Sequence, residues 1–575
     1  MLTALLKLRI RLLRLFRFSD MHTMLLWAAV VGVAGALVTL AFRDSVAAVE
    51  RLLTGRSDSL VGIAKSLPWQ MRLLLPTAGG AVAGLFLLAA QRFASGTASD
   101  YMEAIAIGDG HIPVRQNLLR SVSSLGSIAS GGSIGREGSM VQLAALAASV
   151  LGRLLRFDTP RLRLLVACGA AAGITSAYST PLAGALFITE IVLGTMVMDN
   201  FGPLVVASVF ANVTMRAFPG YRQPYQMPMF PEISGVEVLL FVLMGVVAGL
   251  IAPQFLHLLH WSRNRFRQTG LPLPARLALG GLLVGAISVW VPEVWGNGYS
   301  VVNSLLHQPW VWSAVLVVLF AKIAATALTT GSGAVGGVFT PTLFVGAALG
   351  WLFGAAMHGI FPHATSAPFA YAVVGMGAFL AAATGAPLMA ILMIFEMTLS
   401  YQVVLPLMLA SVLAFLVARS IDGRSMYEIT SRRNREEKER LRLRGMRMGE
   451  LVKPADTVLP LDAGVDEMTR MFLEYPVKYL YVVDDAQRYQ GVVALQDLTS
   501  VLSDKQQARM KCARDFLRRE QLHVLRPEMS LGEALQHFMQ HMGERLPVVQ
   551  SAEAPVLLGV VYKTAVLDAC FQLSR

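Results

Sequence analysis

The chain has 575 residues, of which 55% are hydrophobic and only 15% are charged, and its mean hydropathy is +0.56. These values exclude an ordinary soluble globular protein and indicate a membrane protein with several spans and a smaller soluble part. The formal net charge of +12 is concentrated beside the membrane segments. Attraction to anionic membrane lipid therefore explains this charge better than nucleic-acid binding does.

Basic residues flank the membrane part at both ends. Residues 1–20 alternate lysine or arginine with leucine, which predicts an amphipathic helix that lies on the membrane surface. A second charged run covers residues 432–447 and follows the last apolar segment. By the positive-inside rule, both termini are expected in the cytoplasm.

Apolar runs that are long enough for complete or partial spans occur throughout the first three quarters of the chain. Several are short or interrupted by glycine or proline, and broken helices at membrane depth are tolerated only where they are buried or line a watery cavity. The pattern therefore favours a transporter or a channel. The predicted runs are 23–42, 71–91, 138–154, 161–175, 181–198, 201–217, 236–256, 275–292, 311–328, 338–358, 368–382, 386–399 and 402–419.

A glycine-rich turn at residues 130–139, Ser-Gly-Gly-Ser-Ile-Gly-Arg-Glu-Gly-Ser, places Glu137 between two apolar runs. Burying a charged carboxylate in hydrocarbon is costly unless the group is paired or functional. Glycines allow backbone N–H groups to converge, and the following apolar run would begin a helix whose positive end faces them. This is the geometry of an anion site. The alternative is a tight interhelical turn in which Arg136 and Glu137 pair with each other.

Two segments of the membrane part are similar to each other. Thr-Pro-Leu-Ala-Gly-Ala-Leu-Phe-Ile-Thr-Glu at 180–190 recurs as Ala-Pro-Leu-Met-Ala-Ile-Leu-Met-Ile-Phe-Glu at 386–396, so that Glu190 pairs with Glu396 at an offset of 206. The turn at 132–135 has a counterpart at 333–336, at an offset of 201. Two similar halves, each with a glycine-rich break, predict a substrate site between the repeats.

A second repeat lies in the soluble tail, at an offset of 66. Val458-Leu459, Phe472 and the strand around Val482 recur as Val524-Leu525, Phe538 and the strand around Val548. Each copy is expected to form a strand, an amphipathic helix (465–473 and 531–539), two strands and a further helix. The tail resembles a pair of cystathionine-β-synthase (CBS) domains at 446–505 and 512–572, preceded by a charged linker at 431–445.

Some members of the CBS family bind adenine nucleotides through a hydroxyl residue and an aspartate after the last strand. The first copy retains the aspartate as Asp497 but has Ala494 at the hydroxyl position, and the second copy has Tyr562 and Ala565 at these places. Adenine-nucleotide binding at Asp497 is therefore one interpretation of the tail. The other is a structural dimerisation or gating module.

Residues 21–430 resemble the CLC family of chloride channels and transporters, including its bacterial members. The resemblance depends on Gly-Arg-Glu-Gly at 135–138, on Gly-Val-Phe-Thr-Pro at 337–341, on the two Pro-Leu…Glu segments and on Tyr427. It implies a polytopic helical membrane protein with broken helices and two repeated halves. It also implies a homodimer with one chloride pathway per subunit, located in the bacterial inner membrane, with no cofactor other than bound chloride.

The resemblance also assigns site residues. Glu137 is implied to be the gate, whose carboxylate competes with chloride and leaves when it is protonated or displaced. Tyr427 is implied to be an inner hydroxyl ligand. The remaining implied anion-binding residues are Thr97, which has Ser99 as a competing candidate, and the glycine-rich turns, with Gly135, Arg136, Gly138, Val338 and Phe339.

The type of transport depends on a second glutamate. Proton-coupled antiporters of the family usually carry an inner glutamate one residue after the position of Glu190, and this chain has Ile191 there. Isoleucine cannot relay a proton, so we expect a voltage- or pH-gated chloride channel, with a chloride/proton antiporter as the alternative. A cation transporter with a regulatory tail is a remote alternative, because the spans hold almost no carboxylates. No HExxH or similar spacing indicates an enzyme, and Cys168, Cys512 and Cys570 have no metal-site or disulfide spacing.

Overall fold

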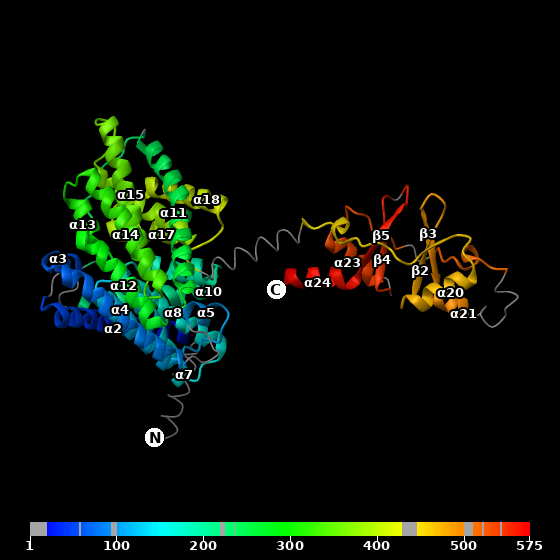
Figure 1. Cartoon of the computed structure of the whole chain (residues 1–575), viewed down its shortest axis with the longest axis horizontal. Helices are drawn as coiled ribbons and strands as arrows, with labels where there is room; N and C mark the ends of the chain where they lie inside the picture. The colour runs from blue at the N-terminus through cyan, green and yellow to red at the C-terminus, as the bar shows by residue number, and fades with distance from the viewer. Residues whose placement is uncertain are drawn as a thin grey trace, which may run out of the picture. The chain divides into compact units, whose positions relative to one another are not determined.

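The structure is a computed structural model that describes residues 20–56, 59–93, 100–218, 223, 225–235, 237–427, 445–499, 510–519, 523–540, 543–551 and 553–574. The chain divides into two compact units, residues 1–432 and 433–575, which are drawn in Figure 1 and described separately here. Most of the predicted surface helix at 1–20, the linker at 431–445 and Thr97 lie outside the described residues.

The membrane unit is a bundle of helices, and each of the thirteen predicted apolar runs coincides with a helix or with a pair of consecutive helical segments. Among the described residues, seven helices are long and apolar enough to cross a membrane. The helices of the first half are α2 (Asp20–Thr54), α3 (Leu60–Ser66), α4 (Trp69–Gln91), α5 (Tyr101–Ala106), α6 (Val114–Ala129), α7 (Glu137–Leu154), α8 (Thr159–Tyr178), α9 (Pro181–Leu186), the π-helix η1 (Phe187–Leu193) and α10 (Met198–Ala217).

The second half repeats much of this order. It contains α11 (Glu237–Gln268), α12 (Leu273–Trp290), the short 3₁₀ turn η2 (Pro292–Val294), α13 (Tyr299–His307), α14 (Trp312–Ser332), α15 (Phe339–Ile360), α16 (Pro368–Thr384), α17 (Pro387–Thr398), the 3₁₀ turn η3 (Tyr401–Val403) and α18 (Val404–Ile421). The predicted polytopic helical fold with broken helices is confirmed.

Several helices were not predicted from hydropathy. Helices α3, α5 and α13 are shorter than ten residues, and α6 carries four serines, all of them buried: Ser121, Ser123, Ser124 and Ser127. Buried serines lower the mean hydropathy without exposing the helix, and the hydroxyls of Ser121 and Ser123 bond to carbonyl groups inside the unit. Ser123, for example, donates to the carbonyl of Ala83 on α4 at 2.8 Å.

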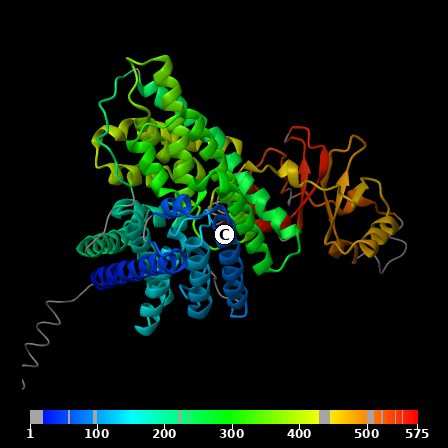
Figure 2. The same ribbon diagram turned by 60° about the vertical axis from the view of Figure 1, so that its left-hand side comes forward.

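The two halves of the membrane unit are built in the same way. Helix α8 ends at Ser179 in the left-handed conformation (φ 61°) and α16 ends at Gly385 (φ 72°), and a proline begins the next helix two residues later in both cases. These positions obey the offset of 206. In Figure 2, the first half (blue to cyan) and most of the second half (green to yellow) occupy opposite sides of the unit.

The glycine-rich turns also match, but at an offset of 202 and not 201. Gly131 (φ 100°) corresponds to Gly333 (φ 101°), and the following helices begin at Glu137 and Phe339. The identity of the glycines alone misplaced this pair by one residue, because consecutive glycines fill the turn in both copies.

The soluble unit contains two similar α/β modules. The first has a three-stranded sheet in the order β1 (Val458–Pro460), β2 (Tyr479–Val483) and β3 (Tyr489–Ala494), with β1 parallel to β2 and β2 antiparallel to β3. Helix α20 (Val465–Glu474) and the short α21 (Leu495–Thr499) complete it. Short 3₁₀ turns, η4 (Met448–Leu451) and η5 (Ala513–Phe516), precede the two modules.

The second module has α23 (Leu531–Gln540), the antiparallel pair β4 (Arg545–Val549) and β5 (Leu557–Tyr562), and α24 (Lys563–Ser574). The strand predicted at 524–525 is reduced to a single parallel bridge between Leu525 and Val548. The two modules share a small apolar core that includes Tyr481, Val492 and Val560. They therefore pack on each other as the repeat predicted.

Candidate functional site

Glu137 is the first residue of α7 and is almost completely buried, with 2% of its surface exposed. One carboxylate oxygen, Oε1, accepts a hydrogen bond from the hydroxyl of Tyr299 at 2.6 Å. The other, Oε2, has no hydrogen-bond partner among the described residues. A buried carboxylate at a helix N-terminus is stabilised by the helix dipole and by the free N–H groups of the first turn.

The N-termini of α7 and α15 are joined by a short bridge between the two glycine-rich turns. The N–H of Gly135 donates to the carbonyl of Gly337 at 2.7 Å, and the N–H of Gly337 donates to the carbonyl of Gly135 at 2.8 Å. A Cβ atom on Gly138 would lie 3.1 Å from the nitrogen of Gly337, so the two backbones approach more closely than most side chains allow. The positive ends of two helices from different halves therefore meet at Glu137.

A large cavity of 780 Å³ reaches this meeting point. Five of the predicted site residues line it together: Glu137, Gly138, Val338, Phe339 and Tyr427. Gly135 and Arg136 do not line it but flank it, Gly135 through the bridge to Gly337 and Arg136 through the ring of Tyr299, which lies 5.6 Å from its guanidinium carbon.

The charged residues of the cavity favour anions. Arginines outnumber acidic residues in its lining, which contains Arg120, Arg263, Arg267, Arg276, Asp100, Glu103 and Glu137. Positive charge around a water-accessible cavity raises the local concentration of anions. No group of three or more histidine, cysteine or acidic side chains that could hold a metal ion occurs among the described residues.

Tyr427 reaches the cavity because the segment after α18 is fixed to the end of α16. The N–H of Met426 donates to the carbonyl of Ala383 at 2.8 Å, and the hydroxyl of Ser425 donates to the carbonyl of Thr384 at 2.6 Å. The ring of Tyr427 packs against Phe187, at 5.6 Å between ring centroids. Thr97, the other predicted hydroxyl ligand, lies outside the described residues, so its role stays a prediction.

Three residues near Glu137 were not identified from the sequence. Thr340 donates to the hydroxyl of Tyr299 at 3.4 Å, and the hydroxyls of Tyr178 and Thr340 are 2.8 Å apart. Tyr178, Tyr299 and Thr340 belong to α8, α13 and α15, so a hydroxyl chain crosses three helices before it reaches Glu137. Thr340 lies within the motif Gly-Val-Phe-Thr-Pro, but its hydroxyl was not assigned a role there. Tyr178 and Tyr299 are far from it in the sequence, and no local signal distinguishes them.

Ile191, at the inner glutamate position, and its neighbour Glu190 both lie in η1. Ile191 is fully buried in η1. Its neighbour Glu190 accepts hydrogen bonds from the N–H groups of Leu388 at 3.2 Å and Met389 at 2.7 Å. Glu190 is thus a carboxylate that caps α17.

In the soluble unit, Asp497 is engaged by Arg518. The guanidinium donates to both carboxylate oxygens, from Nε at 2.7 Å and from Nη2 at 2.5 Å. These hydrogen bonds raise the pKa of Arg518. A nucleotide ribose at Asp497 would have to displace this arginine.

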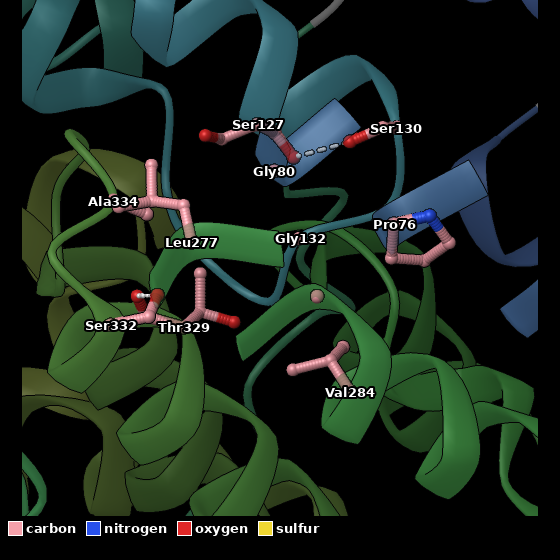
Figure 3. Close-up of a pocket in the computed structure, with 11 residues that line it drawn as sticks. Pro76, Gly80, Ser127, Ser130, Gly132, Leu277, Val284, Thr329, Ser332 and Ala334 are labelled. Carbon is pink, nitrogen blue, oxygen red and sulfur yellow. Dashed lines mark hydrogen bonds between the residues drawn. The ribbon is translucent and has the colours of Figure 1, made fainter. Parts of the chain in front are cut away.

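A second, smaller cavity lies behind the glycine-rich turn (Figure 3). Its volume of 20 Å³ is sufficient for about one water molecule. The hydroxyl of Ser130 donates to the carbonyl of Ser127 at 3.3 Å, and that of Ser332 to the carbonyl of Thr329 at 2.8 Å. None of the predicted anion-binding residues lines it, so it is distinct from the large cavity at Glu137.

Comparisons with known proteins agree with this geometry. A family model described as voltage gated chloride channel matches residues 79–419, and a CBS domain model matches residues 449–504 and 513–571. A putative chloride channel protein, ClcB-like, from Ralstonia nicotianae is 56% identical over 423 residues, which are 73% of this chain and 99% of that protein. The voltage-gated ClC-type chloride channel ClcB of Escherichia coli O9:H4 (strain HS) is 41% identical over 415 residues, 71% of this chain and 98% of that protein.

Solved structures share the fold. The crystal structure of a slow cyanobacterial Cl⁻/H⁺ antiporter is 25% identical and covers 71% of this chain and 97% of that chain, with a TM-score of 0.64. A eukaryotic CLC transporter is 19% identical and covers 95% of this chain and 98% of that chain, with a TM-score of 0.61.

Proposed function

The chain belongs to the voltage-gated chloride channel (CLC) family, carries a C-terminal pair of CBS domains and is a multi-pass membrane protein that transports chloride and is not an enzyme. On this premise, we propose that it is a gated chloride channel in which the carboxylate of Glu137 is the gate. The observation that carries the proposal is the position of Glu137, buried where the N-termini of α7 and α15 meet at the cavity.

The electrostatics of this position support a gate. Two anions within a few ångströms repel each other strongly, so the carboxylate and a chloride ion exclude each other from the same place. Protonation removes the competing charge. The backbone dipoles of Val338 and Phe339 and the hydroxyl of Tyr427 then offer partial charges, which bind an anion without trapping it.

Chloride is expected to enter through the arginine-rich cavity. Tyr427 lies just beyond the last span, and Arg263 and Arg267 lie in the last turns of α11. The positive-inside rule places this end of the unit in the cytoplasm. We therefore propose that the cavity is the cytoplasmic vestibule, in a bacterial inner-membrane protein with both termini in the cytoplasm.

Ile191 and Glu190 favour a channel over an antiporter. Coupled transport needs a path on which a proton can travel between Glu137 and the cytoplasm. Ile191 has no ionisable group, and both oxygens of Glu190 accept backbone hydrogen bonds. The alternative is a chloride/proton antiporter, as the cyanobacterial protein of similar fold is.

The family resemblance also supports a homodimer with one pathway per subunit. We propose this state for the protein in lipid, where the apolar faces of its helices contact other subunits or acyl chains. Single-molecule photobleaching of labelled protein in liposomes tests it, because a monomer bleaches in one step and a dimer in two.

Replacement of Glu137 tests the gate. Glu137→Gln mimics a neutral carboxyl group and Glu137→Ala removes it, so chloride efflux from liposomes should remain and become independent of pH. Glu232, which is exposed, provides the matched control, since Glu232→Gln should retain the pH dependence of the natural protein. An unchanged pH dependence in both Glu137 variants would refute the gate assignment.

A further inference from the structure

Tyr299 is held in a defined position beside Glu137. Its N–H donates to the side chain of Asn297 at 3.3 Å. Gly298 adopts a positive φ of 94°, and a Cβ atom there would lie 2.8 Å from the ring of Phe344. The buried ammonium of Lys322 binds the preceding loop through the carbonyl of Gly296 at 2.6 Å. The first residue of α13 therefore cannot move far from the gate.

The ring of Tyr299 is also enclosed on two sides. Tyr225 packs edge to face against it, at 4.8 Å between ring centroids, and the guanidinium of Arg136 lies over it. A cation over the ring adds positive potential next to the hydroxyl. The surroundings thus favour a negatively charged partner for this hydroxyl.

The hydroxyl chain fixes the direction in which Tyr299 donates. Because Tyr299 gives its proton to Glu137, its oxygen accepts from Thr340, and the proton between Tyr178 and Thr340 must then come from Tyr178. Chains of this kind strengthen each hydrogen bond in them. Tyr299 is therefore a prearranged donor whose acceptor is a carboxylate oxygen in this structure.

Two further polar atoms nearby have no partner. The hydroxyl of Tyr225, a residue that is 2% exposed, and Oε2 of Glu137 make no hydrogen bond with the described residues. A buried donor without an acceptor costs free energy unless a ligand or water satisfies it. Among the described residues, the hydroxyl of Tyr225 is therefore a buried donor without an acceptor, on a ring that packs against Tyr299.

Tyr299 contacts Glu137 from outside the lining of the large cavity. Glu137 lines the large cavity, whereas Tyr178, Tyr225 and Tyr299 do not. A chloride ion that takes the place of the Glu137 carboxylate would therefore lie within hydrogen-bond reach of the Tyr299 hydroxyl.

We propose that Tyr299 is a side-chain ligand of an anion site at the outer side of the gate, where chloride replaces the carboxylate of Glu137 and accepts the same hydrogen bond. Tyr225 supplies a second hydroxyl to this site. The inference depends on the proposed role of Glu137 as the gate and adds to it the residues that bind the anion once the gate has left.

Chloride titration of purified protein by calorimetry tests the site. In the Glu137→Ala background the carboxylate no longer competes, and Tyr299→Phe then removes one hydrogen bond to an anion while retaining the ring and its contacts. We expect chloride affinity to be about 10- to 100-fold weaker in the double variant than in Glu137→Ala. Tyr371→Phe, which removes a buried hydroxyl from a ring that packs on Phe241, is the matched control and should have no effect.

A flux measurement provides a readout that a purely structural role would not give. With Glu137 present, Tyr299→Phe removes the hydrogen bond that keeps the carboxylate in place. Chloride efflux at neutral pH should therefore increase by up to about tenfold. Thr340→Val, which leaves the Tyr299 hydroxyl in place but removes its donor, should cause a smaller increase. Loss of folding would instead reduce efflux.

The outcomes separate the two proposals. If Glu137→Ala abolishes pH dependence but the double variant binds chloride within twofold of Glu137→Ala, the role of Tyr299 is refuted and the gate remains. Equal losses in Tyr299→Phe and Tyr371→Phe also refute it. If Glu137→Ala leaves pH dependence intact, the gate itself is refuted.

Discussion

Glu190 and Glu396 cap each other's helices across the two halves of the membrane unit. The carboxylate of Glu190 accepts from the N–H groups of Leu388 and Met389 at the start of α17, and that of Glu396 accepts from Leu182 and Ala183 at the start of α9, both at 2.9 Å. Each half of the repeat therefore supplies a glutamate whose carboxylate caps a helix of the other half. Each glutamate satisfies N–H groups that would otherwise have no partner in the first turn of a helix.

Removal of either cap should destabilise the fold. Glu396→Ala leaves two backbone N–H groups without their charged acceptor, which should cost about 3 kcal/mol, and Glu190→Ala should cost a similar amount because its contacts are equivalent. Thermal unfolding in detergent, followed by size-exclusion chromatography, measures the difference. The exposed Glu232→Ala is the control, and melting temperatures equal to that of this control would contradict the cap assignment.

The capping of Glu190 also bears on proton transport. Ile191 is buried and has no ionisable group, and both carboxylate oxygens of Glu190 already accept backbone hydrogen bonds. An imposed chloride gradient should therefore drive little or no uphill proton movement. Simultaneous chloride and proton recording from liposomes tests this. Stoichiometric proton movement would refute the channel proposal, and its loss in Glu190→Gln would show that Glu190 carries the proton.

The sequence was sufficient to predict those features that are formed by residues close together in the chain or by regular patterns along it. The glycine-rich turns and Glu137 were recognisable from a short motif, and the tail repeats were recognisable because matching segments recur at a constant offset of 66. Thirteen helical runs were recognisable because lipid demands long apolar segments. The serine-rich α6 was missed because its four serines lower its hydropathy although all of them are buried in the bundle.

The contacts around Glu137 could not be predicted. Tyr178, Tyr299 and Thr340 come from three helices in different parts of the chain, and only the packing of α8, α13 and α15 brings their hydroxyls together. Hydropathy does not distinguish a tyrosine that packs in a core from one whose hydroxyl faces an anion.

Lys322 is expected to stabilise the fold by holding the loop that precedes Tyr299. It is fully buried, and its ammonium donates to the carbonyls of Val294 at 2.9 Å and Gly296 at 2.6 Å. Lys322→Met preserves the shape but leaves both carbonyls without a donor, so we expect a loss of about 1 to 3 kcal/mol in unfolding free energy. Because this loop precedes Tyr299, chloride affinity should weaken as well.

The thermal stability and chloride titration described above measure both effects. Lys322→Gln, which can still donate to one carbonyl, should lie between the natural protein and Lys322→Met. If Lys322→Met is as stable as the natural protein, the removal of a buried charge offsets the two lost hydrogen bonds, and the lysine is not needed to hold the loop.

The last prediction concerns the ion pair between Asp497 and Arg518 in the CBS pair. Their side chains are 25% and 38% exposed, so the pair itself should contribute only about 1 kcal/mol. Its main effect is to occupy the one acidic residue that a nucleotide ribose would need. We therefore expect that millimolar AMP or ATP leaves the melting temperature of the 446–575 fragment unchanged.

A fragment that binds a nucleotide at a hundred times its Kd would gain about 2.7 kcal/mol, and a small domain would show this as a rise of several degrees. Arg518→Ala frees Asp497 and separates the two interpretations of the tail. If nucleotide stabilises the Arg518→Ala fragment but not the natural one, Arg518 blocks a nucleotide site that the fold retains. Stabilisation of the natural fragment that disappears in Asp497→Ala would instead contradict our prediction and establish Asp497 as a ribose ligand. The absence of any shift in all three fragments would leave the tail as a structural module, as the replacement of the hydroxyl position by Ala494 and Tyr562 suggests.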